Sequence, residues 1–539
     1  MKTINLLKIM TCALLFSSEV GAQTIYDAAK FSGKDLNGTA RFVGMGGAMG
    51  ALGGDISTIS TNPAGIGIYR SNDLMTTFGF NYTSSESNYK GNIMNSDKYR
   101  GSFDNIGFVY SSKIGNQTAL RYVNFGFNYH KAKSFNRDFA MGGDMAGISQ
   151  TDQMANMTDG ASIDRLENKD VFTNTEIGWL SALGWKKALL YSDGTDLYKG
   201  FPGSSPNGAY SSRERGGIDV YDFNLSFNIQ DRVYLGFTFG AYDLNYTKDT
   251  YYSESLYNNN TDYFYSLDSY TKTSGTGYDF KAGVIVRPLE DSPLRIGAAI
   301  HSPVFYNLTL YSSAILGSDA DRDKINNAPI PITFKTVDTY DYVNGDAITD
   351  YKLRTPWKYN LSLGYTIGSN VALGAEYEYQ DYSTSKLSYG DGVRMSNENG
   401  MMKDMLKGVN TLRLGAEIKL VPEFAVRAGY NYSSAVFEND ALKGLPYNSI
   451  HTDTDFSNEK SINNFTLGLG YRIGNFYADI AYQYSVYKED FYPFVRGFYG
   501  LDLDNKIPNK GEILSDMNLI KTKVNNDRQQ VLLTLGFRF

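Results

Sequence analysis

Side chains that could carry out catalysis or bind a metal are few in this sequence. Its three histidines are His130, His301 and His451, and none has a second histidine at metal-ligand spacing. Ser302 follows His301, but a serine hydrolase also needs a third polar group that orients the histidine, and the sequence assigns that role to no residue. We therefore expect no catalytic residues, no bound metal and no cofactor, and a lipase is the least favoured alternative.

The single cysteine, Cys12, lies in a predicted secretory signal peptide that covers residues 1–22. Lys2 and Lys8 supply its positive charge, an apolar run follows, and small residues precede the predicted cleavage site after Ala22. Because cleavage removes Cys12, the mature chain is expected to be free of cysteine, which excludes disulfides, thiolate zinc sites and a cysteine nucleophile.

Three arginines on the polar faces of predicted strands are candidates for binding a carboxylate. They are Arg295, Arg413 and Arg427. A planar guanidinium group can bind both oxygens of a carboxylate, so one of these arginines could anchor an acidic ligand. The alternative is structural pairing with acidic residues of the same faces, Glu376, Glu378 or Glu417.

The elements that carry these residues alternate between bulky apolar and small or polar side chains. The pattern is clearest in segments 221–229, 359–367, 465–473 and 531–539, and it has the period of two that is typical of β-strands. Such segments predict fourteen strands, near 73–83, 102–112, 118–131, 217–230, 232–248, 273–287, 293–313, 356–368, 370–385, 409–420, 423–436, 462–474, 475–488 and 527–539.

Two features distinguish a membrane barrel from a soluble β-sandwich. The predicted connections alternate between tight turns, such as Gln230-Asp231 and Gly474-Asn475, and polar loops of roughly 20 to 80 residues, as in outer-membrane barrels. The polar faces also carry full charges, for example Lys281 and Asp479, and burying such ions in a sandwich core costs several kcal/mol each. We therefore predict an all-β fold, a transmembrane antiparallel β-barrel at residues 72–539.

The composition agrees with this prediction. The net charge of −7 lacks the basic surplus of nucleic-acid-binding proteins, so we expect no nucleic-acid partner. Aromatic residues make up 14% of the chain and glycine contributes 54 residues, which favours pleated and tightly turned backbone. Outside the N-terminus no apolar run reaches the length of about 18 residues that a transmembrane helix needs.

The segment Gln23–Ser71, between the signal peptide and the first strand, does not fit a barrel wall. Its glycine-rich part, 42–55, lacks the preceding strand and the Gly-Lys-Ser/Thr ending of a phosphate-binding loop. Asn62 and Pro63 predict a stiff turn, because proline fixes φ and the asparagine side chain can bond back to the backbone. We expect a compact hatch inside the barrel, with gating residues Asp55, Asn62, Pro63, Ala64 and Gly65.

The stretch GTARFVGMGGAMGALGGDISTISTNPAGI, which contains Asn62-Pro63-Ala64, resembles the start of FadL-type long-chain fatty-acid transporters of Gram-negative outer membranes. The later stretches RIGAAIHSP, TPWKYNLSLGYTIGSNVALGAEYEYQDYS and NTLRLGAEIKLVPEFAVRAGYNYSS look like hairpins of that family. The resemblance implies a fourteen-stranded barrel that is occluded by an N-terminal hatch and imports hydrophobic molecules passively. It also implies ligand capture at an extracellular apolar groove and release after a hatch shift or sideways through the wall.

The longest predicted loop, 131–216, contains two of the three tryptophans and an apolar run that predicts one or two short amphipathic helices. Two interpretations are open: an exposed surface that captures ligand, or side chains that pack the loop against itself or the barrel rim. The capture residues would be Trp179, Leu180, Leu183 and Trp185.

Together these features predict an outer-membrane transporter for hatch-gated, passive uptake of long-chain fatty acids or other hydrophobic compounds. The expected partners are those small molecules, outer-membrane lipid and lipopolysaccharide, and the barrel-insertion machinery, which would engage the alternating residues that end in Phe539. A haem-binding barrel and an adhesin-type surface barrel are the alternatives. A plain surface barrel, however, has no use for a glycine-rich hatch.

Overall fold

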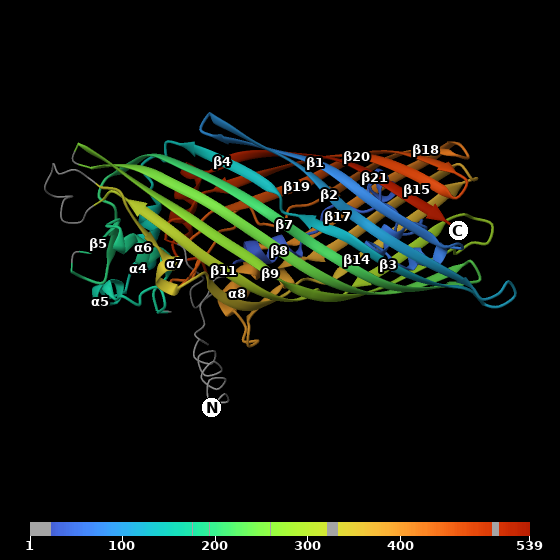
Figure 1. Cartoon of the computed structure of the whole chain (residues 1–539), viewed down its shortest axis with the longest axis horizontal. Helices are drawn as coiled ribbons and strands as arrows, with labels where there is room; N and C mark the ends of the chain where they lie inside the picture. Colours follow the sequence, from blue (N-terminus) through green and yellow to red (C-terminus); the bar gives the residue numbers. More distant parts are fainter. Residues whose placement is uncertain (1–22, 175, 193, 259, 321–332, 498–505) are drawn as a thin grey trace, which may run out of the picture.

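The chain forms a closed antiparallel β-barrel with small helices at one end and a short N-terminal segment inside it (Figure 1). The computed structural model describes residues 23–174, 176–192, 194–258, 260–320, 333–497 and 506–539. The predicted signal peptide therefore lies outside the described residues. Within those ranges, no helix has the length and apolar character needed to cross a membrane.

Fourteen strands make up the wall, which confirms the predicted fold class and strand number. Four of them are interrupted and carry two labels each. In chain order the strands are β1 (Asp73–Tyr89), β2 (Asn92–Lys113), β3 with β4 (Leu120–Ser134, Arg137–Gly143), β7 (Ser204–Ile229), β8 (Val233–Asn258), β9 (Thr261–Val286), β10 with β11 (Arg295–His301, Phe305–Ser318), β13 with β14 (Ala347–Arg354, Lys358–Ile367), β15 with β16 (Val371–Asp381, Lys386–Tyr389), β17 (Gly408–Val421), β18 (Phe424–Ser433), β19 (Phe456–Ile473), β20 (Phe476–Tyr492) and β21 (Thr522–Arg538).

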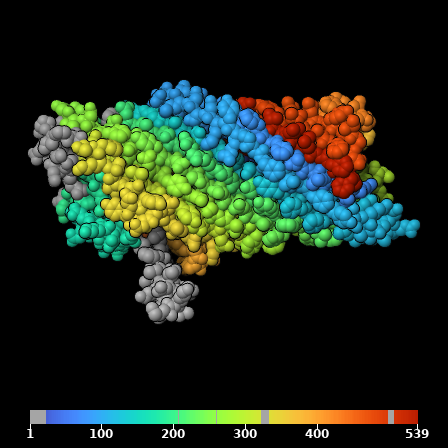
Figure 2. Space-filling model, viewed as in Figure 1, coloured from blue at the N-terminus to red at the C-terminus, as the bar shows by residue number. Residues whose placement is uncertain are grey.

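The first and last strands close the barrel. β1 pairs with β21 along its length, from Asp73 opposite Arg538 onward. Beyond that pair, Asn72 and Phe539 exchange two backbone hydrogen bonds, with N–O distances of 3.0 and 3.1 Å. Figure 2 shows β1, in blue, directly beside β21, in red. The seam pairs the edges of the first and last strands, as closure of a barrel in lipid requires.

An apolar belt surrounds the barrel next to its short turns. On β7 the outward side chains change from exposed Leu225, Phe223 and Tyr221 to Arg215 and Arg213 farther from the turn. A tilted strand needs about 9–11 residues to cross the hydrocarbon core of a membrane, and the apolar part of β7 is of this length. The belt therefore has the extent of a surface that contacts membrane hydrocarbon.

Several predicted loops are continuations of the strands. β1 and β2 meet at the turn Lys90-Gly91, whereas the sequence predicted that they end near 83 and begin near 102. β3, β4 and the first part of β7 likewise occupy both ends of the predicted loop 131–216. Most exposed residues of these extensions are polar because they lie beyond the belt, although Ile93 and Tyr99 are exceptions, so the alternation fades while the backbone pairing continues.

The remaining loops form a cap at the end of the barrel opposite the C-terminus (Figure 1). The cap has its own apolar core. Its elements are α4 (Gln150–Thr158), α5 (Ile163–Glu167), α6 (Trp179–Lys186), β5 (Leu190–Ser192), β6 (Tyr198–Gly200), β12 (Lys335–Asp338), α7 (Thr339–Val343), η3 (Tyr382–Thr384), α8 (Ser396–Met405) and α9 (Lys510–Ile520).

The proposed capture residues belong to this core. Trp179, Leu180, Leu183 and Trp185 are at most 6% exposed. The Trp179 indole donates a hydrogen bond to the Phe172 carbonyl over 3.0 Å. The expectation that these side chains form an exposed capture surface is therefore wrong, since α6 packs all of its apolar side chains into the cap.

The N-terminal segment folds inside the lumen as four short helices. They are α2 (Ile25–Ser32), α3 (Ala40–Gly44) and the 3-10 helices η1 (Ile56–Ser60) and η2 (Pro63–Ile68). Thr24 and Asp27 form a capping box that starts α2. The backbone N–H of Ala40 donates to Thr534 on β21, while η2 lies against β7, β8 and β9. The segment thus contacts opposite sides of the wall, and we refer to residues 23–71 as the hatch.

Candidate functional site

The Asn-Pro-Ala motif attaches the hatch to the wall. The Asn62 side chain accepts a hydrogen bond from the Ala64 N–H and donates one to the Val284 carbonyl of β9, each over 3.1 Å. The carbonyl of Pro63 accepts a hydrogen bond from the Asn224 side chain of β7 over 3.2 Å. The motif therefore caps η2 and joins it to two wall strands.

The two other predicted hatch residues hold the hatch to itself. Asp55 caps η1 through the Ser57 N–H at 2.9 Å and accepts from the Thr39 hydroxyl at 2.8 Å. The carbonyl of Gly65 accepts the Gly54 N–H at 3.1 Å. A side chain at Gly65 would collide with Thr58, so glycine is required for this close packing.

Three wall glycines admit the hatch backbone at close range. They are Gly374, Gly415 and Gly429, on β15, β17 and β18. A Cβ atom at any of them would overlap with backbone atoms of residues 45–48. Because the wall has no side chains at these positions, the hatch backbone lies directly against it.

The three arginines do not form free ligand anchors. Arg413 contacts Glu376 over 2.5 Å and Glu378 over 3.1 Å, and Arg427 contacts Glu417 and Asp479, each over 2.6 Å. Arg295 donates to the Leu52 carbonyl of the hatch over 2.6 Å. Structural pairing therefore accounts for Arg413 and Arg427, and Arg295 positions the hatch.

The histidines also have structural surroundings. The His301 ring lies 3.2 Å from the Thr61 carbonyl of the hatch, and Ser302 binds backbone groups of Phe280 and Pro303 instead of the ring. His451 contacts Asp453 over 2.6 Å. In the part of the chain that the structure describes, no group of three His, Cys, Asp or Glu side chains is placed to hold a metal ion.

A cavity of about 890 Å³ lies between the hatch and the cap. Its lining contains more Lys and Arg than Asp and Glu, although the whole chain has a net charge of −7. Apolar side chains line other parts of it, including Phe135, Leu310, Val409, Phe437 and Phe456. The cavity therefore offers both charge and apolar surface to a ligand.

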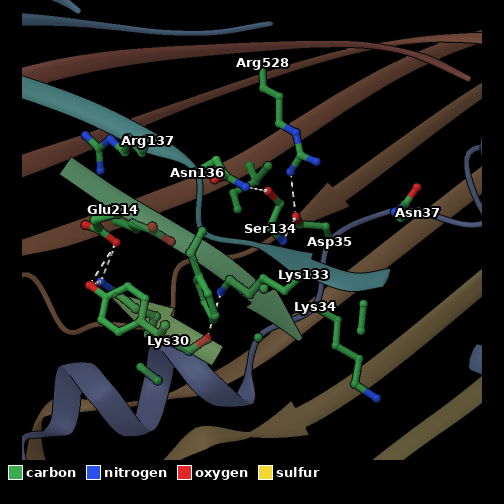
Figure 3. Close-up of a pocket in the computed structure, with 18 of the residues that line it drawn as sticks. Lys30, Lys34, Asp35, Asn37, Lys133, Ser134, Asn136, Arg137, Glu214 and Arg528 are labelled. Carbon is green, nitrogen blue, oxygen red and sulfur yellow. Dashed lines mark hydrogen bonds and ion pairs between the residues drawn. The ribbon is translucent and has the colours of Figure 1, made fainter. Parts of the chain in front are cut away.

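Hatch and wall contribute the charged side chains together (Figure 3). Lys30 of α2 contacts Glu214 over 2.8 Å and the Tyr246 hydroxyl over 2.6 Å. Lys133 of β3 donates to the Lys30 carbonyl over 2.9 Å, next to the end of α2. These contacts fix α2 at the edge of the cavity.

Two neighbouring hatch residues, Lys34 and Asp35, have shifted pKa values. Burial would raise the pKa of Asp35, but Arg528, which contacts it over 2.6 Å, lowers that pKa below its ordinary value. Burial, together with the charges of Lys358 and Lys281, lowers the pKa of Lys34 to about 7. Among the described residues, the Lys34 ammonium donates one hydrogen bond, to the Tyr242 hydroxyl, over 2.8 Å.

Some cavity cations lack a carboxylate partner. Among the described residues, Lys34, Lys133 and Arg100 form no ion pair, whereas Lys30 and Arg528 do. An unpaired cation beside an open cavity is available to an anionic group of a ligand. The sequence could not identify Lys133, because a bulge between Lys131 and Lys133 breaks the alternation on β3.

The cavity also reaches a gap in the wall. Backbone pairing between β2 and β3 ends at Asn105 opposite His130. Beyond this point side chains bridge β2 and β4, the continuation of β3, including Lys98 and Asp138, which are 2.6 Å apart. Residues from both sides of the gap line the cavity.

No protein-family model and no curated protein matches the chain. Among solved structures, a FadL homologue from Pseudomonas aeruginosa matches with a TM-score of 0.50 and 13% identity, over 94% of this chain and 100% of that chain. The toluene transporters TodX of Pseudomonas putida and TbuX of Ralstonia pickettii match with TM-scores of 0.46 and 0.42, at 11% and 12% identity, over 94% of this chain and 100% and 99% of theirs. The first match shows that this chain shares the fold of the FadL homologue.

Proposed function

We propose that this chain is an outer-membrane channel for passive uptake of small hydrophobic and amphiphilic molecules, with residues 23–71 as its gate. One observation carries the proposal: a closed barrel with an apolar belt encloses a cavity of about 890 Å³ and the N-terminal segment 23–71, which is hydrogen-bonded to the inner wall. A purely structural barrel needs neither feature. The solved toluene transporters and the FadL homologue are consistent with this function.

The cavity lining favours an amphiphile with an acidic head, and a long-chain fatty acid is the ligand that we propose. The apolar side chains would contact the acyl chain, and the unpaired ammonium groups of Lys34 and Lys133 would bind the carboxylate. These contacts in the cavity replace the contacts with lipid or detergent that the fatty acid loses when it enters the barrel. This assignment moves the ligand anchor from the three arginines to two lysines.

The ligand has two routes out of the cavity. One leads past the hatch, which many contacts hold in place. The other leads through the gap between β2 and β3, where side-chain pairs such as Lys98 and Asp138 take the place of a backbone ladder. Lys98 and Asp138 are partly exposed to solvent, and an ion pair that keeps contact with solvent contributes little, about 1 kcal/mol, so the gap is the easier of the two to open.

The test is uptake of radiolabelled palmitate by a Gram-negative host that lacks its own fatty-acid channel. Cells that produce the protein should take up palmitate faster than cells that do not. Joint replacement Lys34→Gln and Lys133→Gln should lower the initial rate several-fold and leave uptake of neutral toluene unchanged. Arg232→Gln, at an exposed turn beside Glu290, is the matched control. Equal palmitate rates with and without the protein would refute the transport function.

A further inference from the structure

The outer surface of the barrel carries a group of basic residues near one wall interruption, four of them exposed and one, Lys386, partly buried. They are Lys352 and Arg354 on β13, Lys386 on β16, Arg394 just after β16, and Lys403 on α8, and we call them the basic patch. On β13 the alternate side chains, Tyr351 and Leu353, are buried. Lys352 and Arg354 therefore point away from the lumen.

Strand register brings the members of the patch together. Arg354 lies directly opposite Lys386, and Lys352 lies opposite Ser388, which itself bridges to Arg394. The charges of Arg354, Arg394 and Lys403 all act on Lys386. Like charges at directly opposed positions of a sheet destabilise it, so this arrangement is unfavourable unless an anion covers it.

In the part of the chain that the structure describes, the patch has no acidic partner in direct contact. Within the described parts of the chain, none of its five members forms an ion pair or a side-chain hydrogen bond. Two nearby carboxylates have other partners, because Asp350 accepts from the Thr309 hydroxyl and Asp391 accepts from the Val393 N–H. In the lumen of the same barrel, by contrast, most arginines form ion pairs with carboxylates of the protein.

The patch lies at the outer margin of the apolar belt. Below the interruption between β13 and β14, the outward residues Trp357, Tyr359 and Leu361 are exposed and apolar or aromatic. Arg354 is three residues above Trp357, a rise of about 10 Å along a strand. Aromatic side chains are typical of the membrane interface, so the patch lies at the level of lipid headgroups.

An apolar groove of about 620 Å³ begins beside Trp357. It runs across the outer face of β7 to β10, and the small Ala282 lies among larger rings. Its other large apolar lining residues are Phe125, Phe223, Leu225, Phe237, Phe239, Phe280 and Ile300. The groove faces the region that we assign to membrane hydrocarbon, and it adjoins the patch at Trp357.

We infer that the basic patch and the groove form one binding site for a phosphate-bearing lipid of the outer leaflet. The phosphate would neutralise Arg354, Lys386 and their neighbours, and an acyl chain would lie in the groove over Ala282. Charge complementarity selects a phosphorylated lipid over a neutral one, since each basic residue near the surface attracts anionic headgroups. This inference rests on the outer-membrane location proposed above, but it does not require the barrel to transport a ligand.

The test is native mass spectrometry of the purified, detergent-solubilised chain with defined lipids. The unaltered protein should bind bisphosphorylated lipid A at least tenfold more tightly than the same lipid without phosphates. Joint replacement Arg354→Gln, Lys386→Gln and Arg394→Gln should abolish this preference. Arg213→Gln with Arg215→Gln, on the outward face of β7, should preserve it, because Asp138 and Asp249 already lie beside those arginines.

A second variant tests the groove. Ala282→Trp should weaken binding of both lipids several-fold and leave the preference for phosphate intact. Equal affinity of the unaltered chain for the two lipids would overturn the inference, as would an unchanged preference in the triple variant. Displacement of lipid A by millimolar inorganic phosphate would also overturn it, because the patch would then be a site for free anions. If the triple variant does not assemble, the two-lipid comparison and the phosphate competition on the unaltered chain decide.

Discussion

The guanidinium group of Arg41 in the hatch forms two parallel hydrogen bonds with the carboxylate of Glu417 on β17, over 2.8 and 2.9 Å. Its third nitrogen donates to the Gly54 carbonyl over 3.0 Å. Glu417 also accepts from Arg427 on the adjacent strand over 2.6 Å. One carboxylate of the wall thus holds the hatch and a neighbouring strand together.

Replacement Glu417→Gln should loosen the hatch, because Arg41 loses its charged acceptor, whereas Arg427 keeps Asp479. Hydrogen bonds to charged groups contribute about 1.5–3 kcal/mol, so we expect a loss of about 2 kcal/mol in hatch docking. This corresponds to about 30-fold faster hydrogen exchange of the amides in residues 40–54, measured by mass spectrometry. Arg41→Gln should have a smaller effect, because Glu417 keeps Arg427. Glu290→Gln, in an exposed ion pair, should leave the exchange unchanged.

Gly415→Val should displace the hatch without preventing barrel assembly. The new side chain would overlap with the Met45 carbonyl on the inside of the wall, whereas the strand pairing of β17 is unaffected. Limited trypsin digestion should then cleave the hatch at Arg41, while the heat-modifiable mobility of the barrel persists. Gly101→Ala is the control, since nothing lies within 4 Å of the added atom. Resistance of the Gly415→Val hatch to trypsin would contradict the close fit.

Ligand binding in the cavity should weaken as the pH rises. The pKa of Lys34 is lowered to about 7, so this side chain carries its positive charge below that pH and loses it above. A long-chain alkyl sulfonate stays ionised throughout, so it isolates the lysine. Its affinity should fall about fivefold between pH 6 and pH 9, equivalent to about 1 kcal/mol, with a midpoint above 7 because the bound anion favours the ammonium.

Lys34→Arg is the control for this prediction, because a guanidinium group keeps its charge across the range. Calorimetric titration of the variant should give an affinity that does not change with pH. A pH dependence that persists in Lys34→Arg would assign the effect to another group.

Joint replacement Asn62→Ala and Pro63→Ala should lower uptake of labelled fatty acid while the barrel still assembles. The variant loses the cap of η2 and the hydrogen bond to the Val284 carbonyl, so the gate no longer takes a defined position. An uptake assay measures the loss of transport, and heat-modifiable gel mobility shows whether the barrel still assembles. Unchanged uptake would count against gating by this motif.

Deletion of Phe539 should reduce assembly. The residue exchanges two backbone hydrogen bonds with Asn72, and its ring stacks on Phe537 with centroids 5.6 Å apart. Phe539→Leu keeps the backbone bonds and should assemble better than the deletion. The yield of heat-modifiable barrel in outer-membrane fractions measures both, and equal yields for the deletion and the unaltered chain would refute the prediction.

Local patterns determined the wall of this protein. Alternating segments such as 359–367 and 465–473 identify strands on their own, because the apolar belt demands an outward hydrophobic side chain at every second position. The Asn62-Pro63 turn and the glycines around it also marked the hatch, since backbone conformation is a local property. The alternation does not predict the ends of β1 at Tyr89 and of β8 at Asn258. These ends lie beyond the apolar belt, and a strand face in contact with water needs no hydrophobic side chain at every second position.

Tertiary structure decided which side chains are available to a ligand. Arg413 and Arg427 are neutralised by carboxylates on neighbouring strands, and only register establishes those pairs. Trp179 lies in a core that distant loops complete, and Lys133 faces the cavity because of one bulge. The type and spacing of the residues in a strand predict which face of the strand each side chain occupies. The partners of that side chain, however, come from segments far away in the chain. Burial and charge balance are therefore properties of the assembled barrel alone.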